Sequence, residues 1–554
     1  MKINKIIFIA LMVILASCQN LLEKYPLDAP SSATFPKSKD ELTYAINGVY
    51  NSLNYNPGSY AQAELYWDAA SDLVYSRGGY AISDDIVLGS STPNTGMYSG
   101  AWTKYYQSIQ RSNFILSNMD AARKTIDAAY CDRIEGEAKF LRAWNYMYLT
   151  ELFGDVPLIT TMQTLADTKV VRTPKADVVT LMLNDLDFAA SKLPKSYSGA
   201  DLGRVTQGAA LALKARVALY NKKYDIAATA ATSVMGLGVY ALGTNYGDQF
   251  QLAGATSAES IFQLNYSLTV TKNMSQIIFN SRYGQGWSIL CPSQWLVDSY
   301  LCTDGKPIDQ SPLYNQARPY ENRDPRLKMT ILVPGTWFGG VLFETHPDSL
   351  TTFKNTGGVL SRIGNQEVTN AYATFTGYLF RKNCDESVFS NPNNGSIMPL
   401  KLIRYAEVLL TYVEAKIELN QIDQSVYDAI NLIRRRVKMP DVPTGMTQDQ
   451  FRQVLRQERK IEMAGEGLRL FDIRRWKIAQ YVLEGNLPGR KNKAYWYNPG
   501  VPTINQYGHP VYSNQATVFK TIQARHFDTT KDYLWAVPQK ERDINKNMTQ
   551  NPGY

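Results

Sequence analysis

The chain has 554 residues, of which 44% are hydrophobic and 19% are charged, and this length is ample for a large apolar core. Its formal net charge of +8 is spread along the sequence with one short basic run, Arg434–Arg436, so the composition does not favour a nucleic-acid-binding face. The five cysteines form no CxxC pair and only three histidines occur, which argues against a zinc site. We predict no metal site and no cofactor.

The N-terminus has the layout of a secretory signal peptide. Two lysines precede an apolar run, 6–16, which is shorter than the about 20 residues that a membrane-spanning helix needs. The sequence LASC at 15–18 resembles a bacterial lipobox, in which the chain is cut before an acylated cysteine. We therefore predict removal of residues 1–17 and lipid attachment, such as palmitate, at Cys18. The alternative is an ordinary signal peptide with an accidental cysteine.

Helical patterns dominate the sequence that follows. Apolar residues recur at helical spacing in 136–153, and Gly154 predicts the end of that helix. Thr206 is the predicted N-cap of a helix at 208–220, and a second alanine-rich helix follows at 224–235 and ends at Gly236. The placement of small residues in this hairpin is similar to that of a tetratricopeptide repeat.

A second helical hairpin is predicted further along the chain. Its helices cover 402–419 and 426–437, and Thr447 with Gln450 then forms a capping box that predicts another helix start.

Three regions without helical periodicity separate the helical blocks. Residues 51–102, 240–300 and 331–400 are rich in Gly, Asn, Ser, Thr and aromatic residues, and we expect irregular loops there and after residue 485. The segment ESIFQLNYS is one short strand-like exception. Long loops of this kind often carry function.

Seven stretches in the same order along the chain together resemble the SusD/RagB family of nutrient-binding outer-membrane lipoproteins. They are GEAKFLRAWNYMYLTELFGDVPLIT (136–160), GRVTQGAALALKARVALY (203–220), ENRDPRL (321–327), RYAEVLLTYVEAKIELN (404–420), RQERKIEMAGEGLRLFDIRRW (456–476), YLWAVP (533–538) and QNPGY (550–554). One small departure is Ala536, where the family more often has proline.

The resemblance implies a mostly α-helical fold, with four tetratricopeptide-like helix pairs and a loop-rich irregular region that has few short strands. The signal peptide would be 1–17, an N-terminal helical region 18–240 and a C-terminal SusD/RagB region 241–554, packed as one unit. The implied location is the extracellular face of the outer membrane. The implied function is to capture an oligosaccharide and deliver it to a SusC-like TonB-dependent transporter, without catalysis.

Other functions stay open beside this one. A peptide-binding lipoprotein with the same type of partner is the main alternative. A glycoside hydrolase and a helical scaffold that binds only proteins are the others.

Aromatic residues outside helical patterns are the candidate ligand contacts, because a flat ring covers the apolar face of a sugar. The aromatic candidates are Trp337, Trp287, Tyr283, Tyr75, Tyr80 and Trp67, and the polar candidates are Arg77 and Arg282. Trp337 stands out because flanking glycines leave its ring little local cover. Trp102 and Tyr106 are similar to core residues of the family and are left out of the site.

Three glutamates spaced four residues apart, Glu458, Glu462 and Glu466, could suggest acid/base chemistry. Like charges at this spacing repel unless cations meet them, so we predict a structural ion network. Its predicted partners are Arg469, Arg474, Arg475 and Arg434–Arg436. Within ENRDPRL, we predict that Arg323, Asp324 and Arg326 hold the turn around Pro325. A disulfide between Cys291 and Cys302 is conceivable, but we favour free buried thiols.

Overall fold

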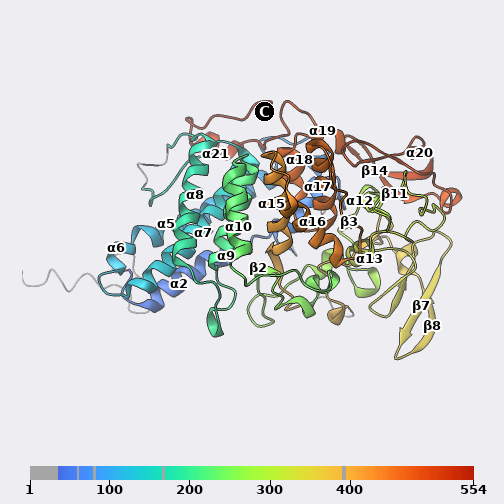
Figure 1. The fold of residues 1–554 in the computed structure, drawn as a ribbon, viewed down its shortest axis with the longest axis horizontal. Helices are drawn as coiled ribbons and strands as arrows, with labels where there is room; N and C mark the ends of the chain where they lie inside the picture. Colours follow the sequence, from blue (N-terminus) through green and yellow to red (C-terminus); the bar gives the residue numbers. More distant parts are fainter. Residues whose placement is uncertain (1–34, 59–60, 79–82, 165–166, 168, 390–394) are drawn as a thin grey trace, which may run out of the picture.

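A computed structural model describes residues 35–554 except 59–60, 79–82, 165–166, 168 and 390–394. Long helices lie side by side on one side of the molecule, and loops with short strands fill the other side (Figure 1). The long helices are α2 (Lys39–Tyr50), α5 (Gly96–Ser117), α7 (Ala128–Phe153), α8 (Lys175–Lys192), α9 (Gln207–Tyr220), α10 (Tyr224–Gly236), α15 (Tyr405–Glu418), α16 (Gln424–Arg436) and α17 (Gln448–Glu462). The predicted signal peptide and Cys18 lie outside the described residues.

Eleven described helices are shorter than eight residues. They are α3 (Ala63–Trp67), α4 (Asp84–Val87), α6 (Met119–Ala122), α11 (Gln276–Phe279), α12 (Gln294–Ser299), α13 (Arg326–Thr330), α14 (Gln366–Thr369), α18 (Arg469–Arg475), α19 (Ala479–Val482), α20 (Gln515–Val518) and α21 (Gln539–Ile544).

The long helices pack in an ordered array. Helix α7 packs against α5 and α8, α9 packs against α8 and α10, and α10 packs against α15. Buried alanines such as Ala215, Ala227 and Ala231 allow the close approach of α9 and α10. The predicted mostly helical fold is confirmed, whereas the number of tetratricopeptide-like pairs stays a prediction.

Local signals placed the helix ends correctly. The side chain of Thr206 accepts a hydrogen bond from the backbone N–H of Ala209 at 3.2 Å, as an N-cap does. Both hydrogen bonds of the capping box between Thr447 and Gln450 are present. Helix α7 ends at Gly154, whose φ of 75° suits glycine.

The strands are short and form small antiparallel sheets. Their bounds are β1 (Val74–Ser76), β2 (Ser260–Leu264), β3 (Leu290–Pro292), β4 (Ile331–Leu332), β5 (Thr336–Phe338), β6 (Val341–Phe343), β7 (Thr351–Thr356), β8 (Val359–Gly364), β9 (Leu379–Phe380), β10 (Leu400–Arg404), β11 (Gly485–Lys491), β12 (Thr503–Ile504), β13 (Pro510–Val511) and β14 (Phe519–Arg525). The two-stranded pairs are β1 with β3, β2 with β10, β4 with β9, β11 with β14 and β12 with β13.

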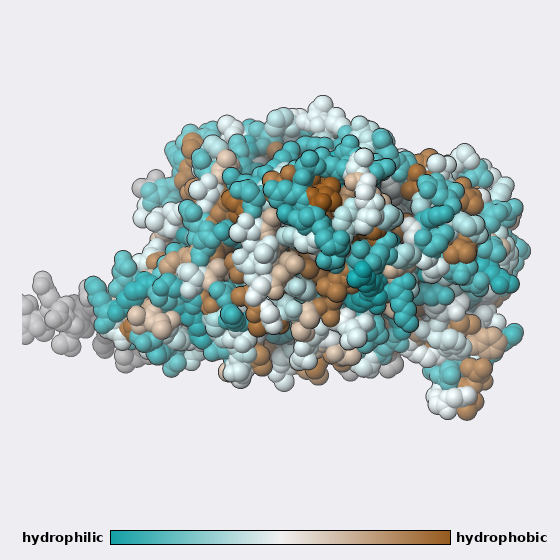
Figure 2. Space-filling view, in the orientation of Figure 1, coloured by the Kyte–Doolittle hydropathy of each residue, from teal (hydrophilic) through white to brown (hydrophobic). Residues whose placement is uncertain are grey.

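A four-stranded sheet, in the order β5-β6-β7-β8, occupies part of the region predicted to be irregular. Its β7–β8 hairpin turns at Gly357 and Gly358, whose φ values are 60° and 90°. The hairpin projects from the body of the molecule at the lower right of Figure 2. Both faces of this hairpin are largely exposed, so its sequence lacks the alternation of apolar and polar residues that reveals a half-buried strand.

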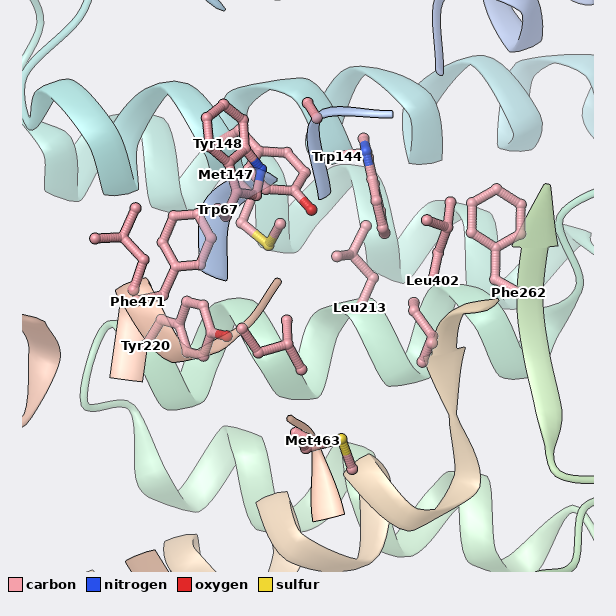
Figure 3. Packing of buried hydrophobic residues seen from close by; sticks show 14 of the residues in the cluster. Trp67, Trp144, Met147, Tyr148, Leu213, Tyr220, Phe262, Leu402, Met463 and Phe471 are labelled. Carbon is pink, nitrogen blue, oxygen red and sulfur yellow. The ribbon is translucent and has the colours of Figure 1, made fainter. Parts of the chain in front are cut away.

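One apolar core joins the two halves of the chain. Trp144 of α7 lies 5.7 Å from Phe262 of β2, and Tyr148 lies 5.7 Å from Phe471 of α18, measured between ring centres. Figure 3 shows this packing. The division at residue 240 stays a prediction. As predicted, Trp102 is buried in this core.

The three glutamates do form a buried ion network. Glu458 pairs with Arg326 at 2.5 Å and with Arg434 at 2.7 Å. The other pairs are Glu462 with Arg326, Arg404 and Arg436, and Glu466 with Arg404 and Lys382, at 2.6–3.0 Å. Burial alone would raise the pKa of Glu462, but the charges of Arg436, Arg404 and Arg326 hold it far below its usual value.

Several predicted partners were wrong, because the fold brings other cations to the network. Arg469 instead pairs with Asp72, Arg475 pairs with Glu414 and Asp472, and Arg474 donates to the carbonyl oxygen of Asp532. Arg435 lies outside the network and pairs with Asp441.

The ENRDPRL segment (321–327) makes both a local ion pair within its turn and ion pairs to distant helix α17. Arg326 pairs with Asp324 at 2.7 Å, as predicted for the turn, and also reaches the glutamates of α17. Arg323 donates instead to the carbonyl oxygens of Val297 and Tyr300.

All four cysteines within the described residues, Cys131, Cys291, Cys302 and Cys384, are free and buried, as favoured from the sequence. None of the described helices combines the length and the apolar character that a bilayer crossing requires.

Candidate ligand-binding site

Residues 371–375 form an irregular loop that presents two partly exposed rings. The side chains of Tyr372 and Phe375 are 40% and 39% exposed. The loop follows α14 and precedes β9, and Phe375 alone among its carbonyl groups accepts a backbone hydrogen bond from a strand, from the N–H of Arg490 in β11 at 2.9 Å. Buried carbonyl oxygens need another source of hydrogen bonds.

Two arginines from distant parts of the chain supply those hydrogen bonds. Arg77, which follows β1, donates from Nη1 to the carbonyl oxygen of Ala371 at 3.2 Å. Its Nη2 donates to the carbonyl oxygens of Tyr372 at 2.8 Å and Ala373 at 2.9 Å. From β11, Arg490 Nε donates to the carbonyl oxygen of Thr374 at 2.7 Å. The backbone beneath the two rings is therefore held before any ligand arrives.

Several predicted residues surround these rings. The guanidinium of Arg77 lies 4.5 Å from the ring centre of Phe375, and that of Arg282 lies 5.6 Å from the ring centre of Tyr372. Trp287 lies 5.3 Å from Tyr372, with the two ring planes at 55°. We call this group the Tyr372 cluster; its members are Tyr75, Arg77, Arg282, Trp287, Tyr372 and Phe375.

Glu367 and Tyr283 connect the cluster to neighbouring elements. Glu367 Oε1 accepts from Ser281 Oγ at 2.6 Å and from the backbone N–H of Arg282 at 2.7 Å. Burial raises the pKa of Glu367, although these hydrogen bonds act in the opposite direction. The hydroxyl of Tyr283 donates to the carbonyl oxygen of Gly364, at the end of β8, at 2.6 Å. These bonds fix the segment that carries Arg282 and Trp287.

Trp67 is not available to a ligand in this structure. Its side chain is 0% exposed, and its ring lies 5.6 Å from Trp535 and 6.3 Å from Tyr148. Figure 3 shows it beside Met147 and Tyr148 in the core. The sequence did not reveal this burial because Trp67 lies in the five-residue helix α3, too short to show helical periodicity.

Two other predicted residues have supporting positions. Tyr75 is only 7% exposed and meets Phe375 edge-on at 5.9 Å, so it supports that ring rather than offering its own face. Arg77 is buried and uses its guanidinium on the loop carbonyls. Tyr80 lies outside the described residues.

Trp337 is exposed but belongs to a different surface. It lies on β5 opposite Leu342 of β6, and 43% of it is exposed. Its neighbour Phe338 points the other way and packs on Phe389 at 5.4 Å. Within the described residues, no ring or cation contact joins Trp337 to the Tyr372 cluster.

Tyr372, Phe375 and Arg490 were missed from the sequence. The segment NAYATFTGY (370–378) mixes aromatic and polar residues outside any helical pattern, as the chosen loops do, and the same criterion would have selected its rings. Arg490 has no such signal, because its role depends on how β11 packs under the loop.

The chemistry of the cluster suits a ligand with an apolar face and a polar rim. Aromatic rings stack on C–H groups, and arginine N–H groups donate to hydroxyl or carboxylate oxygens. A hollow of about 440 Å³ lies elsewhere, between α17 and residues 298–310 and 504–508, and none of the predicted aromatic residues lines it. In the part of the chain that the structure describes, no three His, Cys, Asp or Glu side chains come together as metal ligands.

Comparison with known proteins gives consistent matches along the chain. Residues 250–554 match the family model described as "SusD family", and residues 22–219 match a model described as "Starch-binding associating with outer membrane". "SusD-like protein P25" of Formosa agariphila is 24% identical over 509 residues, covering 87% of this chain and 92% of that protein.

Solved structures agree with this fold. A SusD-like carbohydrate-binding protein of Bacteroides fragilis has a TM-score of 0.81 and 28% identity, covering 93% of this chain and 99% of its own. A laminarin-binding SusD-like protein has a TM-score of 0.68 and 22% identity, covering 94% of this chain and 100% of its own. The second likeness shows the fold alone.

Proposed function

This chain belongs to the SusD family, and on that premise we propose that it is a cell-surface lipoprotein that binds an oligosaccharide without altering it. The proposed binding site is the Tyr372 cluster. The description of the similar Bacteroides fragilis protein as carbohydrate-binding supports the class of ligand.

The observation that carries the proposal is the pair of exposed rings on a backbone that is already fixed. Ordering a mobile loop on binding costs free energy, and preorganisation avoids that cost. The carbonyl groups around Tyr372 are held by Arg77 and Arg490, so little ordering remains for the ligand to provide.

The proposal includes an anchor and a partner. Acylation at Cys18 would tether the chain to the outer membrane, with its binding site on the extracellular face. The bound oligosaccharide would pass to a SusC-like TonB-dependent transporter. Copurification of such a transporter with the tagged lipoprotein from its native membrane tests the partner, and loss of the complex at mild detergent concentrations would count against it.

Isothermal titration with a panel of neutral oligosaccharides tests the site. For a ligand that binds, Tyr372→Ala and Trp287→Ala should each weaken affinity about tenfold or more, since one stacked ring contributes about 1–2 kcal/mol. Tyr44→Ala is the control, because Tyr44 is an exposed tyrosine on α2, outside the Tyr372 cluster. Unchanged affinity in both cluster variants would place the site elsewhere.

Trp337→Ala tests whether the ligand also contacts the surface of β5, which is distinct from the Tyr372 cluster. A loss of affinity would mean that a long ligand spans from the Tyr372 cluster to β5, and no loss would confine the ligand to the cluster.

Two further assays distinguish the alternatives. Competition by peptides but not by sugars would favour the peptide-binding alternative, which depends on backbone pairing more than on stacked rings. Sustained release of new reducing ends from a polysaccharide would mean that the protein is a hydrolase and would refute the proposal.

A further inference from the structure

A second hollow, of about 200 Å³, is lined by an excess of positive charge. It lies between the α9–α10 turn, the end of α15, the middle of α17 and the residues after α18. Its charged lining consists of five cations, Lys222, Arg452, Arg456, Arg475 and Lys477, and two carboxylates, Glu414 and Glu418. We call it the Arg456 hollow.

Both carboxylates of the hollow are already paired. Glu414 accepts from Arg475 Nη2 at 2.7 Å and from Trp476 Nε1 at 2.7 Å. Glu418 accepts from Arg452 Nε at 2.7 Å and from its Nη2 at 3.0 Å. No lining carboxylate therefore remains for the other three cations.

Arg456 has no hydrogen bond or ion pair to any described residue. Its guanidinium stacks on Trp476 at 4.9 Å, and its Nε is buried without an acceptor. A buried arginine N–H without an acceptor is costly, and stacking leaves the edge of the planar guanidinium free to bind a planar or tetrahedral oxyanion.

The two lysines add charge at the same place. Neither Lys222 nor Lys477 forms an ion pair with a described acidic residue, and the Lys477 ammonium lies 3.7 Å from the ring centre of Tyr533. Partial burial lowers the pKa of Lys477, and the nearby charge of Lys222 lowers it further. Like charges that line one hollow are unfavourable unless an anion binds between them.

Helix ends explain only part of this arrangement. Lys222 and Lys477 follow the C-terminal ends of α9 and α18, where cations interact favourably with the helix dipole. Arg456 lies in the middle of α17, so the dipole gives no reason for its position.

We propose that the Arg456 hollow binds an oxyanion: a phosphate, a sulfate or the carboxylate of an acidic sugar. Arg456 would donate from its planar edge, and Lys222 and Lys477 would neutralise the remaining charge. The hollow is smaller than the about 300–1,000 Å³ of most ligand pockets, so it suits one anionic group and part of the molecule that carries it. Its lining shares no residue with the Tyr372 cluster.

Isothermal titration at low ionic strength tests this site with four probes: inorganic phosphate, inorganic sulfate, glucuronate and glucose. We expect saturable binding of at least one anion and none of glucose. Tighter binding of glucuronate would identify an acidic sugar as the source of the anion, and tighter binding of phosphate or sulfate would identify a free ion.

Arg456→Gln should weaken anion binding at least about tenfold, and the double variant Lys222→Gln/Lys477→Gln should do the same. Both lysines are exposed, so the double variant keeps the test valid if Arg456→Gln fails to fold, which circular dichroism would show. Gln453→Ala is the matched control, because Gln453 is exposed on the same helix and, like Arg456, lines the neighbouring 440 Å³ hollow, but it does not line the Arg456 hollow.

Tyr372→Ala should leave anion binding unchanged, so failure of this site is distinguishable from failure of the glycan site. The inference is overturned if none of the three anions binds saturably, or if both the Arg456 and the lysine variants bind as tightly as the unaltered protein.

Discussion

The guanidinium of Arg77 contacts both the backbone and the ring of Tyr372. Its Nη2 donates to the Tyr372 carbonyl oxygen at 2.8 Å, and its central carbon lies 5.5 Å from the centre of the Tyr372 ring. Because the same group also bonds to the two neighbouring carbonyls, Arg77 fixes the orientation of the ring instead of offering free N–H groups to a ligand.

Arg77→Met should therefore weaken glycan binding through the loop. We expect an about tenfold lower affinity by isothermal titration. We also expect faster hydrogen exchange of the amides in 371–375, because three hydrogen bonds from the Arg77 side chain to the backbone carbonyls of this loop are lost. Arg435→Met is a control at an exposed site. Lower affinity with unchanged exchange in the loop would instead indicate direct contact between Arg77 and the ligand.

Arg326→Met should strongly destabilise the fold. Arg326 is buried against Asp324, Glu458 and Glu462, and its removal leaves buried negative charge without compensation, at a cost of about 3–5 kcal/mol. Arg435→Ala breaks an exposed pair and should cost less than about 1 kcal/mol. Urea unfolding measures both values, and equal midpoints for the two variants would contradict the role of the buried network.

The contribution of His509 to stability should fall as the pH is lowered from about 6.5 towards 4. Burial lowers the pKa of His509 from 6.5 to about 4, and the charges of Lys460, Arg469 and Arg525 add to this effect, against Asp72. In this window His509 of the unfolded chain binds a proton that His509 of the folded protein does not, so this residue's contribution to the free energy of unfolding rises with pH, by at most about 3 kcal/mol across the window.

His509→Gln removes this titration. Urea unfolding at several pH values between 4 and 6.5 should give a less positive slope of the free energy of unfolding against pH for this variant than for the unaltered protein. Identical slopes would show that His509 does not contribute.

Cys18→Ser should abolish membrane attachment, because no other acylation site is predicted near the N-terminus. Labelling of growing cells with an alkyne analogue of palmitate should mark the unaltered protein and not the variant, which should move to the soluble fraction. A variant that still takes up the label would refute the lipobox interpretation.

Much of the helical architecture could be predicted from sequence because its signals are local. The caps at Thr206 and Thr447 and the stop at Gly154 depend on residues within one turn of the helix. The β7–β8 hairpin was missed because its exposed faces carry no hydrophobic period. The partners of Glu458 and Glu462 were only partly predicted, since Arg326 is more than 100 residues away in the chain.

The candidate site was predicted by region more than by residue. The segments around Arg77 and Trp287 do meet, but they meet around Tyr372, which was not selected. Trp67 and Tyr80 belong to the same sequence region as Arg77, yet Trp67 is in the core. Composition identifies loops with rings, whereas exposure depends on what packs against each ring.

The sequence by itself determined the helical frame and the family resemblance, because helix caps, periodicity and short motifs are properties of neighbouring residues. Only the tertiary structure decided which rings reach solvent, which arginine holds the 371–375 loop and which cations surround Arg456. These features depend on side chains from segments hundreds of residues apart, and their hydrogen bonds and burial exist only once those segments are packed together.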